Sequence, residues 1–346
     1  MKIGSWALAL IPSLLVIACG GGGGSSGAIM VPPQAVVITE ANAKPVAANA
    51  LDSAQSSSAT QAGAGLLTGV QIEESSGAGF SIQNNFVWMV EAARGALASV
   101  APTASVIATG IAINATQSCA LGGSVTVNGS VASAAGLSAG DNVTLDASNC
   151  KLNQQGVAST MNGRMSLTVN SGSLFTFPYH VVISVMTTSL SVQSGAVTVV
   201  SSGDVRLDWT AASATVQTLV ATGSSLNSRT MNGTTSRSST WTNYTQSWSI
   251  SGSTVSSSLA ASVVTDSSRL GTNGASYTIT TPSAVVWNSG TGVVSAGVVK
   301  VVGAGNSQLL ATVGAGNTVT IQIDANGDGT FEKTITSTVD ELKSLL

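Results

Sequence analysis

From Ser124 to the C-terminus, apolar and polar residues alternate with a period of two, and Gly, Asn and Ser interrupt the alternation at short intervals. Successive side chains of a β-strand point to opposite faces, so this period predicts strands with one buried face and one solvent-facing side. Examples of alternating segments are 125–127, 142–146, 165–169, 196–199, 204–209, 277–280, 293–302 and 318–323. Parallel neighbours would need crossover segments of a dozen or more residues, usually helical. Because no helical period separates these segments, we predict a mainly β fold with one large antiparallel sheet of hairpins, either curved or folded into a sandwich.

Two Asn-Gly pairs, Asn162-Gly163 and Asn232-Gly233, form a weak internal echo, since each follows a Thr-Met pair. Both residue types tolerate positive φ, so we predict a hairpin turn or a β-bulge at each pair.

Residues 85–101 carry the clearest helical period in the chain. Apolar residues recur there at intervals of three and four, which predicts one amphipathic helix packed on the sheet. The stripe consists of Phe86, Met89, Val90, Ala93, Leu97 and Val100. An interfacial membrane helix is the alternative, but its polar face would need Lys and Arg to attract lipid headgroups. A second, short helix is predicted over 339–345.

The N-terminus reads as a secretion signal, with Lys2 before an apolar stretch over 6–17 and a small-residue cleavage site at Val16-Ile17-Ala18-Cys19. This motif resembles the lipobox of bacterial lipoproteins, in which the cysteine receives a diacylglycerol thioether and the signal is cut off before it. The resemblance implies a signal peptide over 1–18, a lipidated Cys19 and a membrane anchor without a spanning helix. In lipoproteins of Gram-negative bacteria, an Asp after the lipidated cysteine favours retention in the inner membrane. Gly20 stands at this position, so the resemblance favours the outer membrane. An ordinary signal peptide with a chance cysteine is the alternative.

After the signal, residues 19–79 are rich in Gly, Ala and Ser and contain three prolines without a sustained period. We predict a flexible low-complexity tether there, with a short ordered piece around 35–39, followed by a β-rich domain over 80–346. Several motifs of that domain resemble a group of β-rich bacterial lipoproteins with no assigned activity. They are residues 122–127, 140–145, 149–150, 162–163, 324–332 and 340–342.

Charged residues make up 8% of the chain, against about 25% in average soluble proteins, and the net charge is −3. The 12 lysines and arginines are scattered, so nucleic-acid binding has no support. Of the three cysteines, Cys119 and Cys150 form an even pair, which predicts a disulfide in a secreted chain. A metal or redox site is the alternative, but no His or third Cys lies nearby and the spacing is not C-x-x-C.

The most specific chemical motif is Asp324-Ala-Asn-Gly-Asp-Gly, which matches the front of an EF-hand calcium loop. Asp324, Asn326, Asp328 and Glu332 are the candidate ligands of a weak calcium site. Position twelve of such a loop is normally a bidentate Glu and is Ile335 here, and strands are predicted on both sides where helices should flank it. An acidic hairpin turn without metal is therefore the other interpretation.

Candidate catalytic residues are few. His180 is the only histidine, and the G-x-S-x-G patterns at 23–27 and 136–140 have no strand-turn-helix context. Asp204 and Asp208 share a strand face with Arg206, which indicates a solvated charge ladder. These residues give a hydrolase little support.

Several aromatic residues between 209 and 248 are interpreted as core residues and not as a sugar- or peptide-stacking platform. They are Trp209, Trp241, Tyr244 and Trp248. In a straight strand the last three residues do not all lie on one face.

The sequence thus predicts a lipid-anchored cell-envelope or surface protein with a structural or interaction role and no catalytic activity, whose protein or glycan partner it does not name. The alternative is an envelope carrier or binding module for a hydrophobic ligand or glycan. A hydrolase acting on glycans or peptides is the third hypothesis.

Overall fold

The computed structural model describes residues 33–55, 111–133, 137–154, 157–173, 177–213, 215–233, 235–267, 269–270 and 274–346. By internal contacts the chain divides after Pro32, and all of these residues belong to the second unit, 33–346. The predicted signal peptide over 1–18, the lipidation site at Cys19 and the predicted helix over 85–101 lie outside the described residues.

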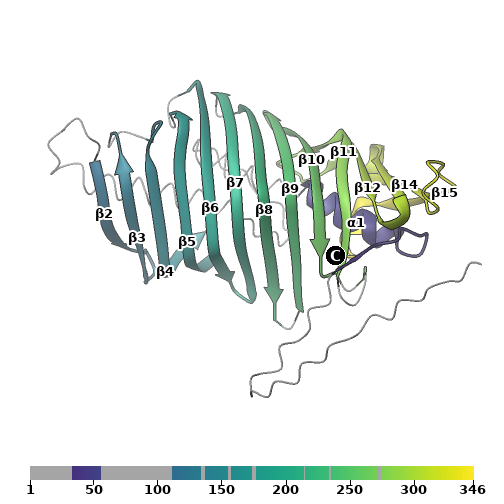
Figure 1. Cartoon of the computed structure of the whole chain (residues 1–346), viewed down its shortest axis with the longest axis horizontal. Helices are drawn as coiled ribbons and strands as arrows, with labels where there is room; N and C mark the ends of the chain where they lie inside the picture. The colour runs from purple at the N-terminus through teal and green to yellow at the C-terminus, as the bar shows by residue number, and fades with distance from the viewer. Residues whose placement is uncertain are drawn as a thin grey trace, which may run out of the picture. The chain divides into compact units, whose positions relative to one another are not determined.

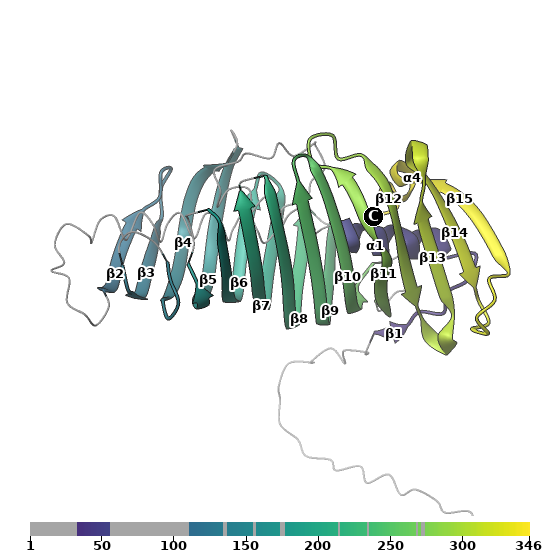
Figure 2. The same cartoon turned by 90° about the horizontal axis from the view of Figure 1, so that it is seen from above.

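The second unit contains one open sheet in which strands follow one another in chain order from β2 to β15 (Figures 1 and 2). Its elements are β1 (Gln34–Ala35), α1 (Ala43–Gln55), β2 (Ile111–Ser118), β3 (Ser124–Val131), β4 (Asn142–Gln154), β5 (Val157–Gly172), β6 (Tyr179–Ser194), β7 (Val197–Ser213), β8 (Val216–Asn232), β9 (Thr235–Ser251), β10 (Thr254–Thr265), β11 (Ala275–Asn288), β12 (Val294–Val302), η1 (Ala304–Asn306), β13 (Gln308–Val313), η2 (Ala315–Asn317), β14 (Thr318–Asp324), β15 (Lys333–Thr338) and α4 (Val339–Lys343). Each neighbouring pair from β2 to β15 is antiparallel, and only β1 joins in parallel, beside β11. The predicted fold class is confirmed.

Each strand buries alternate side chains, as the period of two predicts. In β6, for example, Val181, Ile183 and Val185 are buried, whereas His180, Ser184 and Met186 are partly or fully exposed. These buried side chains form one apolar cluster along the sheet. We call the face that carries them the apolar face, and the opposite face the polar face.

A row of β-bulges crosses the middle of the long strands. Register shifts occur at Ala147–Cys150 in β4, at Asn162–Arg164 in β5 and at Thr187–Leu190 in β6, and similar shifts follow in β7 to β10. A bulge adds one unpaired residue, bends the strand and strengthens its twist. The prediction of a bulge or turn at each Asn-Gly pair is confirmed, since Gly163 sits in the β5 bulge and Gly233 follows the last β8–β9 pair.

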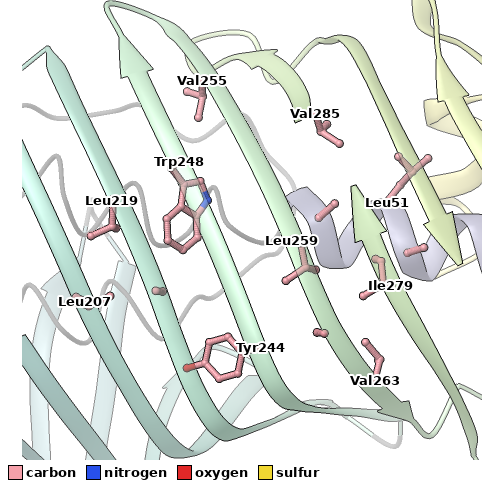
Figure 3. Packing of buried hydrophobic residues seen from close by; sticks show 14 of the residues in the cluster. Leu51, Leu207, Leu219, Tyr244, Trp248, Val255, Leu259, Val263, Ile279 and Val285 are labelled. Carbon is pink, nitrogen blue, oxygen red and sulfur yellow. The ribbon is translucent and has the colours of Figure 1, made fainter. Parts of the chain in front are cut away.

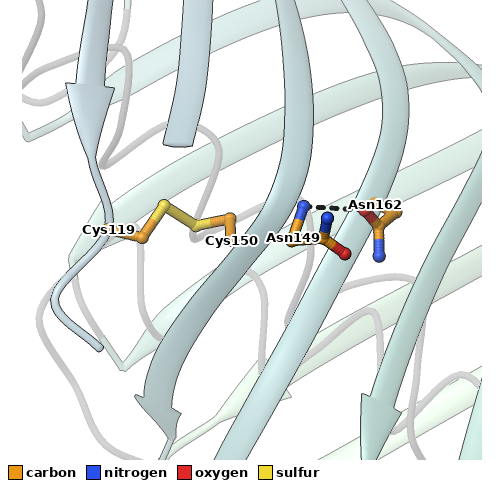
Figure 4. The surroundings of a disulfide bond; sticks show 4 residues. All are labelled: Cys119, Asn149, Cys150 and Asn162. Carbon is orange, nitrogen blue, oxygen red and sulfur yellow. Dashed lines mark hydrogen bonds between the residues drawn. A yellow bond between two sulfur atoms is a disulfide. The ribbon is translucent and has the colours of Figure 1, made fainter. Parts of the chain in front are cut away.

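The β4–β5 bulge is held by a hydrogen bond and lies beside a disulfide (Figure 4). The backbone N–H of Asn149 donates to the side-chain oxygen of Asn162 at 2.7 Å. Cys119 and Cys150 form the predicted disulfide, with a sequence separation of 31. This bond joins the end of β2 to β4 at a point beyond the first residue of β3, because Ser124 pairs with Ser148. In the chain-entropy model a loop of this length contributes on the order of 3.5–4 kcal/mol.

Helix α1 contradicts part of the predicted tether. Residues 33–55, which the tether prediction over 19–79 includes, form β1 and α1, and Val46, Ala50 and Leu51 are buried. Pro45 lies in the first helical turn. Backbone N–H groups in this turn have no intrahelical acceptor, so the helix loses no hydrogen bond by having proline there. Alanines let the helix approach the sheet beside β10 to β14, and α4 packs against it (Figures 1 and 2).

Polar contacts fix α1 in place. The Arg237 guanidinium donates to the side chains of Asn49 and Asp52, at 3.0 Å each. The hydroxyl of Ser257 donates to the carbonyl of Ala54 at 3.3 Å. The predicted C-terminal helix is confirmed as α4, whose start is capped by the Thr338 hydroxyl accepting from the N–H of Glu341.

We predict that Gly163→Ala destabilises the fold by about 2–4 kcal/mol, because the bulge requires positive φ and close approach of the neighbouring strand. Gly163 has φ of 111°, and a β-carbon there would lie 2.4 Å from the carbonyl oxygen of Ser189. Gly195→Ala is the control, since Gly195 also has positive φ but its β-carbon would meet nothing within 4 Å. We expect Gly195→Ala to cost about 1 kcal/mol. Urea unfolding of both variants measures the difference, and equal losses would contradict this account.

Candidate functional site

The acidic loop between β14 and β15 brings the predicted ligands together. One carboxylate oxygen from each of Asp324, Asp328 and Glu332 lies within 4.8 Å of the other two. Asp324 is the last residue of β14 and has an exposed fraction of 0%, whereas Asp328 and Glu332 are exposed. The sequence therefore located the right residues for an acidic cluster.

Backbone N–H groups of the same loop occupy these carboxylates. Asp324 accepts from the N–H of Gly327 at 2.7 Å and of Gly329 at 2.9 Å, and from the side-chain amide of Gln308 at 3.2 Å. Because Asp324 is buried, these three donors compensate the loss of its hydration. Asp324 is thus an organising group of the turn.

The exposed members of the loop follow the same pattern. Asp328 accepts from the N–H of Thr330 at 2.7 Å, and Asn326 accepts from the N–H of Asp328 at 2.8 Å. The N–H of Ala325 donates to Glu332 at 3.2 Å. The bond from Thr330 holds the pKa of Asp328 below its ordinary value. The loop therefore stabilises its own negative charge with backbone donors.

Calcium would need six to eight oxygens at about 2.3–2.6 Å, with the carboxylates turned towards one point. The strands β14 and β15 flank the loop, and Ile335 of β15 stands at the twelfth position. These flanks match the predicted hairpin context and differ from the two helices of an EF-hand. The weak calcium site stays a prediction.

His180 and Asp208 form a pair on the polar face of β6 and β7. The Nε2 atom of His180 lies 2.8 Å from Oδ1 of Asp208, and the side chains are 58% and 53% exposed. Ser138 of the second G-x-S-x-G pattern donates instead to Asp141, at 3.4 Å. Within the described ranges, no hydrogen bond joins Ser138 to His180, so the elements of a Ser-His-Asp relay are not assembled by these contacts.

Asp204 departs from the predicted solvated ladder. Its carboxylate accepts from the backbone N–H of Ser224 and Ser225 at 2.9 and 3.0 Å and from the Ser224 hydroxyl at 2.6 Å. Partial burial raises the pKa of Asp204, but the hydrogen bonds from Ser224 and Ser225 outweigh it and leave this pKa below the ordinary value. The Asp204 carboxylate thus supplies hydrogen-bond acceptors for the backbone N–H groups at the bulge of the neighbouring strand β8.

Tyr244 and Trp248 lie on the apolar face among buried aliphatic side chains (Figure 3). Trp209, Tyr244 and Trp248 are 1–3% exposed, and Trp241 packs against the same cluster. The core interpretation is confirmed. Trp241, Tyr244 and Trp248 would not share one face of a straight strand, but β9 is bulged. Asn243 adopts φ of 49° in this bulge, which reverses the alternation and brings Trp241 edge-on against Tyr244.

Among the described residues, four polar groups on the apolar face have no hydrogen-bond partner. They are the hydroxyls of Ser159 and Tyr179, Nε2 of Gln246 and Nε1 of Trp248, in residues that are 3–7% exposed. Nearby, the indole N–H of Trp209 donates to Gln217 at 3.1 Å, and the Tyr179 ring contacts Trp209 edge-on. Each buried donor without an acceptor lowers the stability of the fold by about 1–3 kcal/mol. A bound molecule whose oxygen atoms accept from these donors would recover part of this free energy.

Sequence reasoning missed these donors and the residues that fix α1. An alternating strand pattern counts Tyr and Trp as apolar and does not show whether their polar atoms find partners. The Val46, Ala50, Leu51 and Ala54 spacing could have indicated α1 if alanine were weighted as a core residue.

Comparison with protein-family models, with curated proteins and with solved structures finds no match to this chain. Across the described residues, the helices are too short or too polar to cross a lipid bilayer.

We predict that Asp324→Ala lowers the free energy of unfolding by about 2–4 kcal/mol, because the N–H groups of Gly327 and Gly329 lose their buried acceptor. Asp328→Ala removes an exposed carboxylate of the same loop, and we expect a loss below about 1 kcal/mol. Urea unfolding measures both values. The same curves with chelator and with about 10 mM Ca²⁺ test the metal interpretation, since a millimolar site would add about 1.4 kcal/mol that Asp328→Ala reduces.

Equal losses of unfolding free energy for Asp324→Ala and Asp328→Ala would show that burial does not determine how much Asp324 contributes to stability. Unchanged stability of the unmodified chain with Ca²⁺ would leave the hairpin turn as the better account.

Proposed function

We propose that this chain is a lipid-anchored cell-envelope or surface protein with a structural or interaction role and without catalytic activity. The observation that supports the role best is the polar face of the sheet. It offers a broad surface of neutral hydroxyl and amide groups, which suits contact with other envelope components through many weak hydrogen bonds.

The groups on the polar face bond to one another across the strands. The cross-strand pairs are Thr116 with Thr126 at 3.0 Å, Thr144 with Ser166 at 3.3 Å, Asn170 with Ser184 at 2.7 Å, Asn227 with Thr240 at 2.7 Å, and Ser247 with Ser258 at 2.6 Å. Such pairs each contribute roughly 0.2–1 kcal/mol to a sheet. They hold the face in a defined pattern that contains few charged groups, such as the Arg164–Asp146 and His180–Asp208 pairs.

The anchor part of the proposal rests on Val16-Ile17-Ala18-Cys19 and on its resemblance to a lipobox. An anchor of two or more acyl chains gives lasting attachment, since each buried methylene contributes about 0.8 kcal/mol. Gly20 supports the outer membrane as the destination by the same resemblance.

A carrier or binding module for a hydrophobic ligand or glycan is the second candidate, and the unpartnered Tyr179, Gln246 and Trp248 favour it. These donors lie among aliphatic and aromatic side chains, so a molecule with an apolar body and a few acceptor oxygens would match them. The Tyr179 hydroxyl is suited to donate, because burial raises the pKa of Tyr179 above its ordinary value.

We predict that Cys19→Ala moves the protein from the membrane to the soluble fraction and abolishes its labelling by radioactive palmitate. Cys119→Ala together with Cys150→Ala is the control, because it removes the disulfide and keeps the anchor. Continued membrane attachment and labelling of Cys19→Ala would contradict the anchor. Envelope extracts passed over the immobilised full chain test the interaction role, which fails if no protein or glycan is retained.

For the second candidate, we predict that native mass spectrometry of the full chain detects a co-purified molecule. Trp248→Phe keeps a ring but removes the Nε1 donor, so retention should fall several-fold. Trp287→Phe is the control, since Trp287 is also buried and its indole nitrogen is not one of the buried groups without a partner. A bare mass for the unmodified protein would remove the support for a carrier.

A further inference from the structure

The two edge strands of the sheet differ in how they are protected. At one edge, β15 begins with Lys333, which pairs with Glu40 at 3.2 Å, and continues directly into α4. At the other edge, β2 has eight residues with neither charge nor proline. Its pairing with β3 runs without a bulge from Ile111 opposite Val131 to Ser118 opposite Ser124. Charges, prolines and bulges are the usual means of preventing edge-to-edge association, and β2 has none of them.

The backbone of β2 is arranged to accept another strand. The N–H of Cys119 donates to the carbonyl of Gly123 at 3.0 Å, which sets the alternation of bonded and non-bonded pairs in the β2–β3 hairpin. By this alternation, odd-numbered residues of β2 bond to β3, and the even-numbered ones turn their N–H and C=O groups outward. The outward residues are Ala112, Asn114, Thr116 and Ser118, whose side chains are exposed. Among the described residues, β2 pairs with β3 alone.

Covalent and hydrogen bonds hold the end of β2 in position. Cys119 directly follows β2 and is linked to Cys150 of β4. In the loop after β2, the N–H of Leu121 donates to the carbonyl of Lys151 at 3.0 Å, and the N–H of Lys151 donates to Gly122 at 2.7 Å. A strand that is already ordered loses less conformational entropy when it binds, so these bonds favour association through β2.

We propose that β2 pairs antiparallel with β2 of a second copy of this chain. A two-fold axis normal to the sheet at Ala115 places Asn114 opposite Thr116 and Ala112 opposite Ser118 of the other copy. This register uses all four outward residues of both strands. It also keeps Ile113, which is 2% exposed, on the apolar face of both copies. The partner is a second copy because an uncharged, unbulged strand is complementary to itself under such an axis. The proposal does not depend on the lipid anchor or on the role of the polar face.

The mass of the full chain in detergent, measured by light scattering or sedimentation over a range of concentrations, tests this pairing. We expect two chains for the unmodified protein and one for Asn114→Pro. Proline removes an N–H that points outward, so the β2–β3 bonds remain. Circular dichroism checks that Asn114→Pro is folded.

A charge pair of variants gives the matched control. Asn114→Lys places like charges close together across the proposed axis and should give the mass of one chain. Asn128→Lys adds the same charge on β3, directly opposite Asn114, and should remain at two chains. A single-chain mass for the unmodified protein at every concentration, or equal effects of the two Lys variants, would overturn the proposal.

Cross-linking tests the register. Ala115→Cys places two thiols opposite each other on the axis and should give a reducible two-chain band. The thiols of Ala112→Cys would lie about 20 Å apart in this register, because each strand residue advances about 3.4 Å, and should not cross-link. Equal cross-linking of the two variants would contradict the pairing.

Discussion

The structure depends on each strand keeping its apolar side chains on the same face of one sheet. A shift of one residue in any strand would turn its whole apolar set towards solvent. The bulges in β4 to β10 make this constraint demanding, because each one reverses the alternation partway along a long strand. The sequence meets the constraint by reversing its own pattern at the same points, as in β6, where Val185 before the bulge and Leu190 after it are both buried.

The few acidic residues serve largely as acceptors for backbone groups where the regular ladder is interrupted. Asp141 accepts from the N–H of Ala132 and of Ser138, both at 2.7 Å, in the loop between β3 and β4. Asp204 does the same for the β8 bulge, Asp266 for the N–H of Ser238, and Asp324 for the β14–β15 loop. A charge-poor chain thus uses its carboxylates to satisfy turns and bulges, which hydroxyls do less strongly. This use accounts for the positions of most acids that could otherwise be taken as catalytic or metal-binding.

Local patterns in the sequence were sufficient to predict the fold class, many of the strands, the disulfide and the C-terminal helix, although no segment was predicted for β2, β8, β9, β10 or β13. The period of two is set by strand geometry, and Cys119 and Cys150 form the only pair left after Cys19. The acidic loop was located for the same reason, since its residues are neighbours in sequence. By contrast, α1 was taken for tether because Ala and Ser mark linkers as readily as closely packed helices. Its helical state depends on Arg237 and Ser257, which lie far away in the sequence. The bulge at Asn243 and the unpartnered donors of Tyr179, Gln246 and Trp248 also depend on tertiary packing, which a single sequence does not display.

In a sheet built strand by strand, each element is stabilised mainly by its two neighbours, as repeats are in a solenoid. Within the part of the chain that the structure describes, the first and last strands have one neighbour each, so they would fray first. The two ends solve this problem differently. The disulfide fixes the β2 end covalently. At the other end, residues 34–55 connect elements distant in sequence, through Asp52 with Arg237, Lys44 with Glu341 and Glu40 with Lys333. These surface ion pairs are each worth little, about 0–1 kcal/mol, so the buried face of α1 supplies most of the stabilisation there. Among the described residues, the β2 end therefore combines a covalently fixed strand with backbone groups that face no partner strand, whereas β15 carries Lys333, paired with Glu40, and continues into α4. This asymmetry is why association is expected at one edge of the sheet and not at the other.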